Sequence, residues 1–423
     1  DGESQCSKKP QMGTHKRGSS PDHRGFWGQE TEPSHPHPGT ITSPMFQQLF
    51  AIARNTFFES IRQPIMLVIL VAAMVLIVLS NPLSAFTMDE NQRMLIDIGL
   101  ATVFLAGAVL AAFIATNVLG REIENRTALT VISKPVNRPV FVIGKFIGVT
   151  AAMVLVGLCM TFTFMLVELH SVLETVRDPV HLPVVVFGVG GLLLGVAAAA
   201  WCNYFYGTVF TSSVICFVTP LLFFAYLLSL NFGPEFDSQP FLRGFKDQIW
   251  LAVIGIMTAI VVLCAIAVAV STRLGQLMTL VTTVGLFILG LLSDWIFGRN
   301  ISRIEDNWLT LARNQGMVKQ EETIRVMRWA SGEIEESTKI IDVPTVPLME
   351  VPGVTGAEIA EWTFSWMGYS ILPNFQILWL SDALTQNLII PGGYLLESVI
   401  YGGLYSVAIL GVGIFLFQRR EIG

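Results

Sequence analysis

Residues 249–271 read IWLAVIGIMTAIVVLCAIAVAVS, a stretch without a single charged side chain. A helix needs about 20 apolar residues to cross the hydrocarbon core of a bilayer, and this stretch is long enough. Because no water reaches that core, each backbone amide has to be satisfied inside the segment, which requires a helix. Similar runs occur at residues 64–80, 98–119, 146–167, 184–201, 208–230, 274–293 and 398–417.

These runs predict an all-α fold, a polytopic transmembrane helical bundle of six to eight spans. The lower number applies if the pair at 184–230 is re-entrant, because its connection from Cys202 to Gly207 carries no charge that would fix it on one side. Composition indicates the same class: 52% of the residues are hydrophobic and 14% are charged, whereas soluble proteins are about a quarter charged. The net charge of −6 argues against a nucleic-acid partner, which would need a basic surface.

The basic residues predict the orientation, since cytoplasmic loops carry an excess of Lys and Arg. With the N-terminus in the cytoplasm, the short outside loops contain Arg93, Arg177, Arg243 and Lys246. The inside segments contain Arg54, Arg62, Arg121, Arg126, Lys134, Arg138, Lys145, Arg273, Arg419 and Arg420. We therefore expect both termini to be cytoplasmic and the protein to lie in the bacterial cytoplasmic (inner) membrane.

The chain divides into four parts by composition. Residues 1–44 are polar and rich in Ser, Pro and Gly, so we expect a disordered tail, with Met45 as the natural start. The transmembrane domain is expected at 45–297 and opens with an interfacial helix at 45–63. An extracytoplasmic helical segment follows at 298–393, and 394–423 holds the last span and the cytoplasmic C-terminus.

The segment 298–393 has three patterns within it. Apolar residues at spacings of three and four predict a helix from Arg299 to Lys339. Three prolines predict extended chain at 341–356. Trp362 to Trp379 is aromatic and apolar but is broken by Pro373, which indicates a pair of interfacial helices.

The sequence lacks the motifs of common catalytic and metal sites. A P-loop would read G-x-x-x-x-G-K-[ST], but the one Gly-Lys pair, Gly144-Lys145, is followed by Phe146 and has Pro139 in place of the first glycine. The chain therefore cannot hydrolyse ATP, and we expect no enzyme activity. His35 and His37 lack a third ligand and the cysteines form no C-x-x-C pair, so we expect no metal site.

The loop between the second and third spans is the most distinctive segment. Residues 120–148 read GREIENRTALTVISKPVNRPVFVIGKFIG. The pattern predicts a short amphipathic helix on the membrane surface at 121–134, stopped by Pro135. Glu122 and Arg126 stand four residues apart, so they could also simply pair on a solvated helix face.

This loop resembles the coupling helix of the type-2 permease family of ATP-binding-cassette (ABC) transporters. The matching positions are Glu122, Glu124, Thr127, Pro135, Arg138, Phe141, Gly144 and Lys145. The start at Met45, the Ser-Thr-Arg turn that ends at Arg273 and the close FQRREIG at 417–423 are also similar to that family.

The resemblance implies that the chain is the permease subunit of an exporter. Its partners would be a cytosolic ABC ATPase, a second permease subunit and membrane lipid. ATP and Mg would be used by the ATPase, and this chain would bind no cofactor. The ATPase-coupling residues would be Arg121, Glu122, Glu124, Thr127, Pro135, Arg138, Lys145 and Arg273. The alternative is an ATP-independent membrane protein, either a secondary transporter or a scaffold for an envelope complex.

Overall fold

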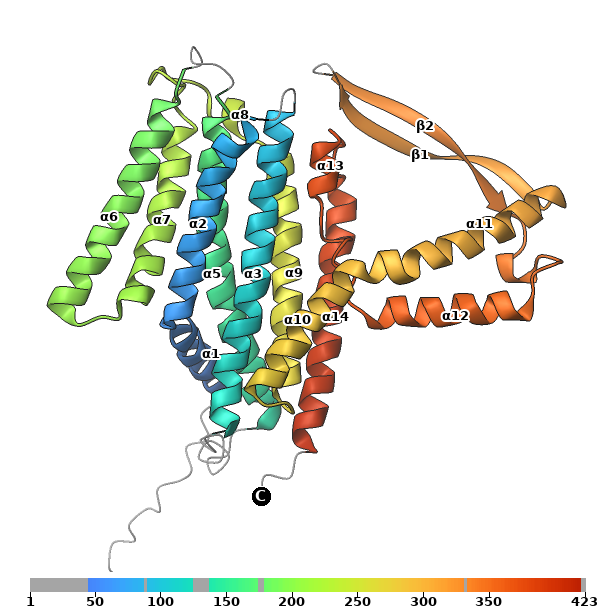
Figure 1. The fold of residues 1–423 in the computed structure, drawn as a ribbon, viewed down its shortest axis with the longest axis horizontal. Coiled ribbons are helices and arrows are strands. Elements are labelled where there is room, and N and C mark those ends of the chain that lie inside the picture. The colour runs from blue at the N-terminus through green and yellow to red at the C-terminus, as the bar shows by residue number, and fades with distance from the viewer. Residues whose placement is uncertain (1–44, 87–89, 125–136, 174–178, 331–332, 420–423) are drawn as a thin grey trace, which may run out of the picture. The chain divides into compact units, whose positions relative to one another are not determined.

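The computed structural model describes residues 45–86, 90–124, 137–173, 179–330 and 333–419. Within them, eight helices are long and apolar enough to cross a membrane. They are α2 (Pro64–Ser84), α3 (Asn91–Glu124), α5 (Arg138–His170), α6 (Leu182–Tyr206), α7 (Phe210–Ser229), α9 (Asp247–Ser271), α10 (Gln276–Ser293) and α14 (Gly392–Gln418). The predicted all-α bundle is confirmed, and the pair at 184–230 consists of two long helices (Figure 1).

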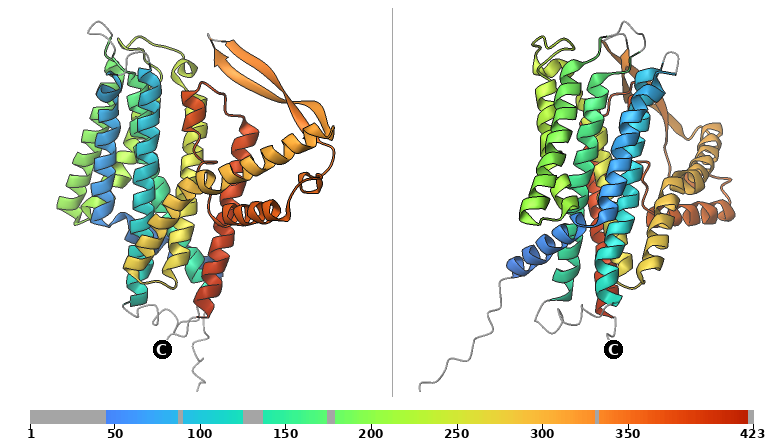
Figure 2. Two further views of the ribbon diagram at one scale, coloured as in Figure 1. Left: turned by 45° about the vertical axis from the view of Figure 1, so that its right-hand side comes forward. Right: turned by 60° about the vertical axis from the view of Figure 1, so that its left-hand side comes forward.

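Helices α3, α5 and α9 form the centre of the bundle. Between 61% and 72% of their apolar windows is buried, against 22% to 28% for α2, α6, α10 and α14. The outer helices turn valine and leucine side chains outward, as helices in contact with lipid do. Burial therefore separates a packed centre from a lipid-facing periphery (Figure 2).

Helices α6 and α7 pack against each other through the glycines of the fourth span. A Cβ added to Gly195 would lie 2.8 Å from Val218 Cγ2, and one added to Gly191 would lie 3.3 Å from the Leu221 carbonyl oxygen. These two glycines, four residues apart, thus allow α6 and α7 to approach each other closely.

The segment after α10 corrects the sequence prediction. Helix α10 continues through a π-helical turn, η1 (Asp294–Gly298), into α11 (Arg299–Asn314). Strands β1 (Val318–Ala330) and β2 (Glu333–Pro344) then form an antiparallel hairpin. The helix predicted as far as Lys339 is therefore wrong beyond Asn314. Gly316, with φ at 69°, ends the helix as a left-handed residue commonly does, and the two strands then satisfy each other's amides.

The chain returns to the bundle through short elements. A 3₁₀ turn, η2 (Leu348–Glu350), precedes α12 (Gly356–Ile371), and α13 (Ser381–Thr385) precedes α14. The extended chain expected at 341–356 is present only in part. The second half of the helix pair expected at Trp362–Trp379 is wrong, because residues 372–380 are not helical. Helix α8 (Phe241–Gly244) is a single helical turn that precedes α9.

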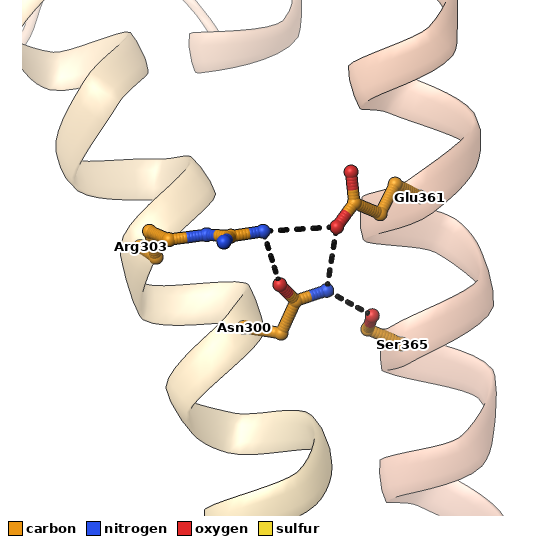
Figure 3. Close-up of polar contacts among 4 residues, drawn as sticks. All are labelled: Asn300, Arg303, Glu361 and Ser365. Carbon is orange, nitrogen blue, oxygen red and sulfur yellow. Dashed lines mark hydrogen bonds and ion pairs between the residues drawn. The ribbon is translucent and has the colours of Figure 1, made fainter.

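Polar side chains join α11 to α12 (Figure 3). The Asn300 side-chain amide donates to Glu361 Oε1 at 3.1 Å and to Ser365 Oγ at 2.9 Å. Arg303 donates to Asn300 Oδ1 at 2.7 Å and to Glu361 Oε1 at 3.0 Å. Because one carboxylate oxygen receives two donors from α11, these bonds fix the register of the two helices.

Candidate functional site: the basic end of the bundle

The predicted coupling residues belong to helix ends that meet at one end of the bundle. The end of α3, the start of α5, the α9–α10 turn and the end of α14 all lie there, beside α1 (Met45–Ile61) (Figures 1 and 2). We call this region the basic end and define it by its described basic residues. These are Arg54, Arg62, Arg121, Arg138, Lys145, Arg273 and Arg419.

Charge distinguishes the two ends of the bundle. The described residues of the basic end include three acids, Glu59, Glu122 and Glu124. The opposite end holds the starts of α3 and α9 and the end of α5, and its described charges are mostly acidic. They are Glu90, Arg93, Asp97, Glu168, Glu235, Asp237, Lys246 and Asp247. A docking partner at the basic end would therefore meet more basic than acidic residues.

Helix α1 lies unusually close to the start of α5. A Cβ added to Gly148 would lie 2.5 Å from the Ala53 carbonyl oxygen, and one added to Gly144 would lie 2.8 Å from Ile52 Cγ2. Two glycines four residues apart let the backbone of a crossing helix approach to this distance. The family-like Gly144 thus serves packing between α1 and α5.

Lys145 lies between those two glycines and is buried. Its ammonium nitrogen lies 3.3 Å from Glu59 Oε2 of α1, and it also lies near the Phe141 ring. A lysine out of water needs an opposite charge close by, so Glu59 and Lys145 hold α1 in register on α5. Lys145, expected from the resemblance to be a coupling residue, is therefore buried and paired.

Arg138 joins the start of α5 to the end of α14. Its guanidinium donates to the Gln418 carbonyl oxygen at 2.9 Å. The last carbonyls of a helix have no partner within the helix, and a cation there also complements the helix dipole. Arg138 therefore caps α14 from a neighbouring helix.

Amide side chains connect three other elements at this end. Asn117 of α3 donates to Gln63 Oε1 at 3.4 Å, and Gln276 of α10 donates to Asn117 Oδ1. The sequence analysis missed this bridge, although amide residues at the ends of apolar runs were a visible signal. Arg273 lies close by in the α9–α10 turn and is exposed, where a partner could reach it.

The predicted coupling helix is only partly described. Helix α3 runs without a break to Glu124, so Arg121, Glu122 and Glu124 extend the span and do not begin a separate helix. The expected break before Arg121 is therefore corrected: charged residues past the bilayer surface can continue a helix as solvated turns. Thr127, Pro135 and the rest of 125–136 lie outside the described residues.

An ion pair at the opposite end was also missed. Glu168, near the end of α5, is buried, pairs with Lys246 and accepts a hydrogen bond from Gln92 at 2.9 Å. These contacts connect α3, α5 and the residue before α9, and so stabilise the centre of the bundle.

Comparison with known proteins adds no family. No protein-family model matches the chain, and neither a curated protein nor a solved structure matches it. The chain is thus a polytopic helical membrane protein in which basic residues predominate at one end of the bundle.

Proposed function

We propose that the chain is the permease subunit of an ABC exporter, driven by ATP hydrolysis in a separate cytosolic ATPase. The observation that carries this proposal is the basic end. There Arg138 at the start of α5 and the exposed Arg273 in the α9–α10 turn come from separate stretches of sequence and lie at the same end of the bundle, where α3 and α14 also end. Such a surface suits docking of a soluble partner, and the resemblance of the α3–α5 connection to a coupling helix gives that partner its class.

The packing offers a route from the docking surface to the membrane helices. The α3–α5 connection continues directly into two of the three most buried helices. Helix α1 is fixed to α5 by the glycine contacts and by the pair of Glu59 with Lys145. A displacement applied by an ATPase at 125–136 would therefore move α3, α5 and α1 as a rigid body.

The charge distribution supports an orientation with the basic end in the cytoplasm. Cytoplasmic loops are enriched in Lys and Arg, and that side is where a cytosolic ATPase would bind. Both termini of the described chain would then be cytoplasmic. A second permease subunit, of the same or a related sequence, would complete the transport path.

Charge reversal at the α3–α5 connection tests the proposal. We expect Glu122→Lys with Glu124→Lys to release the ATPase and abolish ATP-driven transport, with the permease still folded in the membrane. Reversing a docked charge costs a few kcal/mol of association, which weakens the contact about a hundredfold. The measurement is a pull-down from detergent, with the ATPase identified by its P-loop peptide and its turnover assayed.

The matched control is Glu235→Lys with Asp306→Lys. It makes the same charge change at two exposed positions away from the basic end and should leave ATPase recovery unchanged. If the Glu122/Glu124 variant retains its ATPase as the control does, the connection is not a coupling element. If no P-loop protein accompanies even the wild type, the ATP-independent alternative is favoured.

A further inference from the structure

Residues 372–380, between α12 and α13, are the described segment in which non-helical backbone lies among the spanning helices. Pro373, Asn374 and Phe375 are all buried, and Phe375 is 0% exposed. Non-helical backbone is tolerated at membrane depth only where protein or a water-filled cavity covers it. The contacts of this segment therefore show both how deep it lies and what covers it.

Aromatic contacts place the segment at the middle of a span. Phe104 is the central residue of the span Asn91–Asn117. Its ring centroid lies 6.3 Å from that of Phe375, which also lies 5.7 Å from Phe287 of α10. Phe375 therefore packs at mid-depth between α3 and α10.

Two glycines of the spans make room for the carbonyl groups of this segment. A Cβ added to Gly255 of α9 would lie 2.7 Å from the Leu378 carbonyl oxygen, and one added to Gly290 of α10 would lie 2.5 Å from that of Pro373. No larger residue fits at either position without displacing backbone. The segment is thus embedded in α9 and α10.

Tyrosine hydroxyl groups of α14 bind the backbone of this segment. Tyr405 donates to the Ile371 carbonyl oxygen at 3.0 Å, and Tyr401 accepts from the Asn374 amide at 2.9 Å. Tyr394 donates to the Ile377 carbonyl oxygen at 3.3 Å. These bonds satisfy backbone groups that have no hydrogen-bond partner within a helix. A backbone group without a partner would be costly in hydrocarbon.

The order of the three bonds gives the path of the chain. Tyr405 is the central residue of α14, and Tyr394 lies at its start, about 16 Å away at 1.5 Å per residue. From Ile371 to Ile377 the chain can cover about 20 Å when extended. The segment therefore runs from the middle of the span to the end where α14 begins, which is about half of a 30 Å hydrocarbon core.

We propose that residues 371–391 form a re-entrant element, held at mid-membrane depth by a latch of tyrosine hydroxyls on α14. The chain reaches the bilayer centre at the end of α12 and returns to the side on which α14 starts. Because the element lies against α9, α10 and α14, the latch has to open before these helices can separate. The proposal does not depend on transport or on an ATPase.

The depth of the re-entrant element is tested with nitroxide labels. The full chain, with its native cysteines replaced, is labelled at single introduced cysteines and reconstituted in lipid vesicles. A label at Gln376→Cys should be accessible to oxygen and shielded from a water-soluble nickel chelate. Labels at Glu350→Cys and Gln386→Cys should react with an impermeant thiol reagent, both from the same side. The re-entrant path is wrong if Gln376→Cys is as accessible to nickel as the two flanking positions, or if these label from opposite sides.

The latch is tested with Tyr401→Phe combined with Tyr405→Phe, which removes two hydroxyl groups and keeps both rings. We expect the label at Gln376→Cys to become more mobile and the thiol there to react about tenfold faster, as the loss of two hydrogen bonds predicts. Tyr204→Phe with Tyr206→Phe, two exposed residues of α6, is the matched control.

Size-exclusion chromatography separates release of the latch from misfolding. If the double variant aggregates, the single variant Tyr405→Phe should still raise reactivity about threefold. Reactivity equal to that of the Tyr204/Tyr206 control, in well-folded protein, overturns the latch.

Discussion

Glycine decides how closely the helices of this bundle approach one another. Gly148 and Gly144 allow α1 to lie close to α5, and Gly195 allows α7 to lie close to α6. Gly255 and Gly290 leave room for backbone carbonyl groups of the re-entrant element. Hydrophobic burial gives no driving force between helices that are already in lipid, so close packing and hydrogen bonds take its place. A single methyl group at one of these positions should therefore have a measurable effect.

Gly148→Ala is predicted to destabilise the protein. The new methyl group would lie within 2.6 Å of both the Ala53 carbonyl oxygen and Thr56 Cβ, so α1 would have to move away from α5. Overpacking of this kind costs about 1–3 kcal/mol. The measurement is the apparent melting temperature of the purified protein in detergent.

Gly190→Ala is the matched control, because nothing lies within 4 Å of its added Cβ. In that helix the change should be neutral or stabilise by up to about 1 kcal/mol. Equal melting temperatures for the two variants would show that α1 does not pack on α5 as described.

At the scale of elements, α12 shows how one helix can be specified locally and positioned by its neighbours. Thr355 Oγ1 accepts from the Glu358 amide at 3.4 Å, and Glu358 Oε2 accepts from the Thr355 amide at 3.0 Å, a capping box. The outer face of the helix carries exposed apolar residues such as Phe364 and Met367. Its inner face binds α11 through Glu361. An interfacial location of α12 stays a prediction, and on the re-entrant path proposed above it applies to the start of the helix, because the end lies at mid-depth.

The capping box should make the start of α12 sensitive to pH. Hydrogen bonds from Thr355 lower the pKa of the Glu358 carboxyl below its ordinary value, about 4.3 in model peptides. A lowered pKa in the folded state means that the ionised carboxylate stabilises the helix at pH values above the ordinary pKa. This stabilisation is lost as the pH falls through the lowered pKa.

Hydrogen exchange of the α12 amides measures this effect. After correction for intrinsic rates, protection in the wild type should fall between about pH 5 and pH 3. Glu358→Gln keeps an acceptor but cannot titrate, so its protection should stay flat across that range. A parallel decline in both proteins would remove Glu358 as the cause.

At the scale of the whole molecule, the described charges are strongly asymmetric. The described residues of the basic end include seven basic residues and three acids, whereas acids predominate at the opposite end. Because basic loops are retained in the cytoplasm during insertion, this asymmetry predicts that the basic end is cytoplasmic. The β-hairpin would then lie on the opposite, extracytoplasmic side.

This orientation is tested with cysteines placed in a background free of native cysteines. Asn307→Cys on α11 and Leu274→Cys in the α9–α10 turn are both exposed. In intact cells an impermeant thiol reagent should label only Asn307→Cys, and permeabilised cells should label both. The reverse pattern would place the basic end outside and would also exclude docking of a cytosolic ATPase there.

The sequence by itself determined the membrane class and located eight apolar runs, and it left the number of spans at six to eight. It could do so because hydrophobicity and backbone satisfaction in lipid act on each segment separately. The Gly191–Gly195 contact and the grouping of basic loops follow from equally local features. These properties can be predicted without knowing which helices pack against each other.

Tertiary structure decided the features that depend on contacts between distant residues. The β-hairpin after Asn314 forms because two strands pair with each other. The sequence predicted a helix there because apolar residues within the segment recur at the spacing of a helix. The burial of Lys145 beside Glu59 depends on α1 lying across α5. Residues 372–380 are stable as buried, non-helical chain only because α14 supplies tyrosine hydroxyls and α9 and α10 supply glycines. No local pattern contains that information, since each partner lies in another part of the sequence.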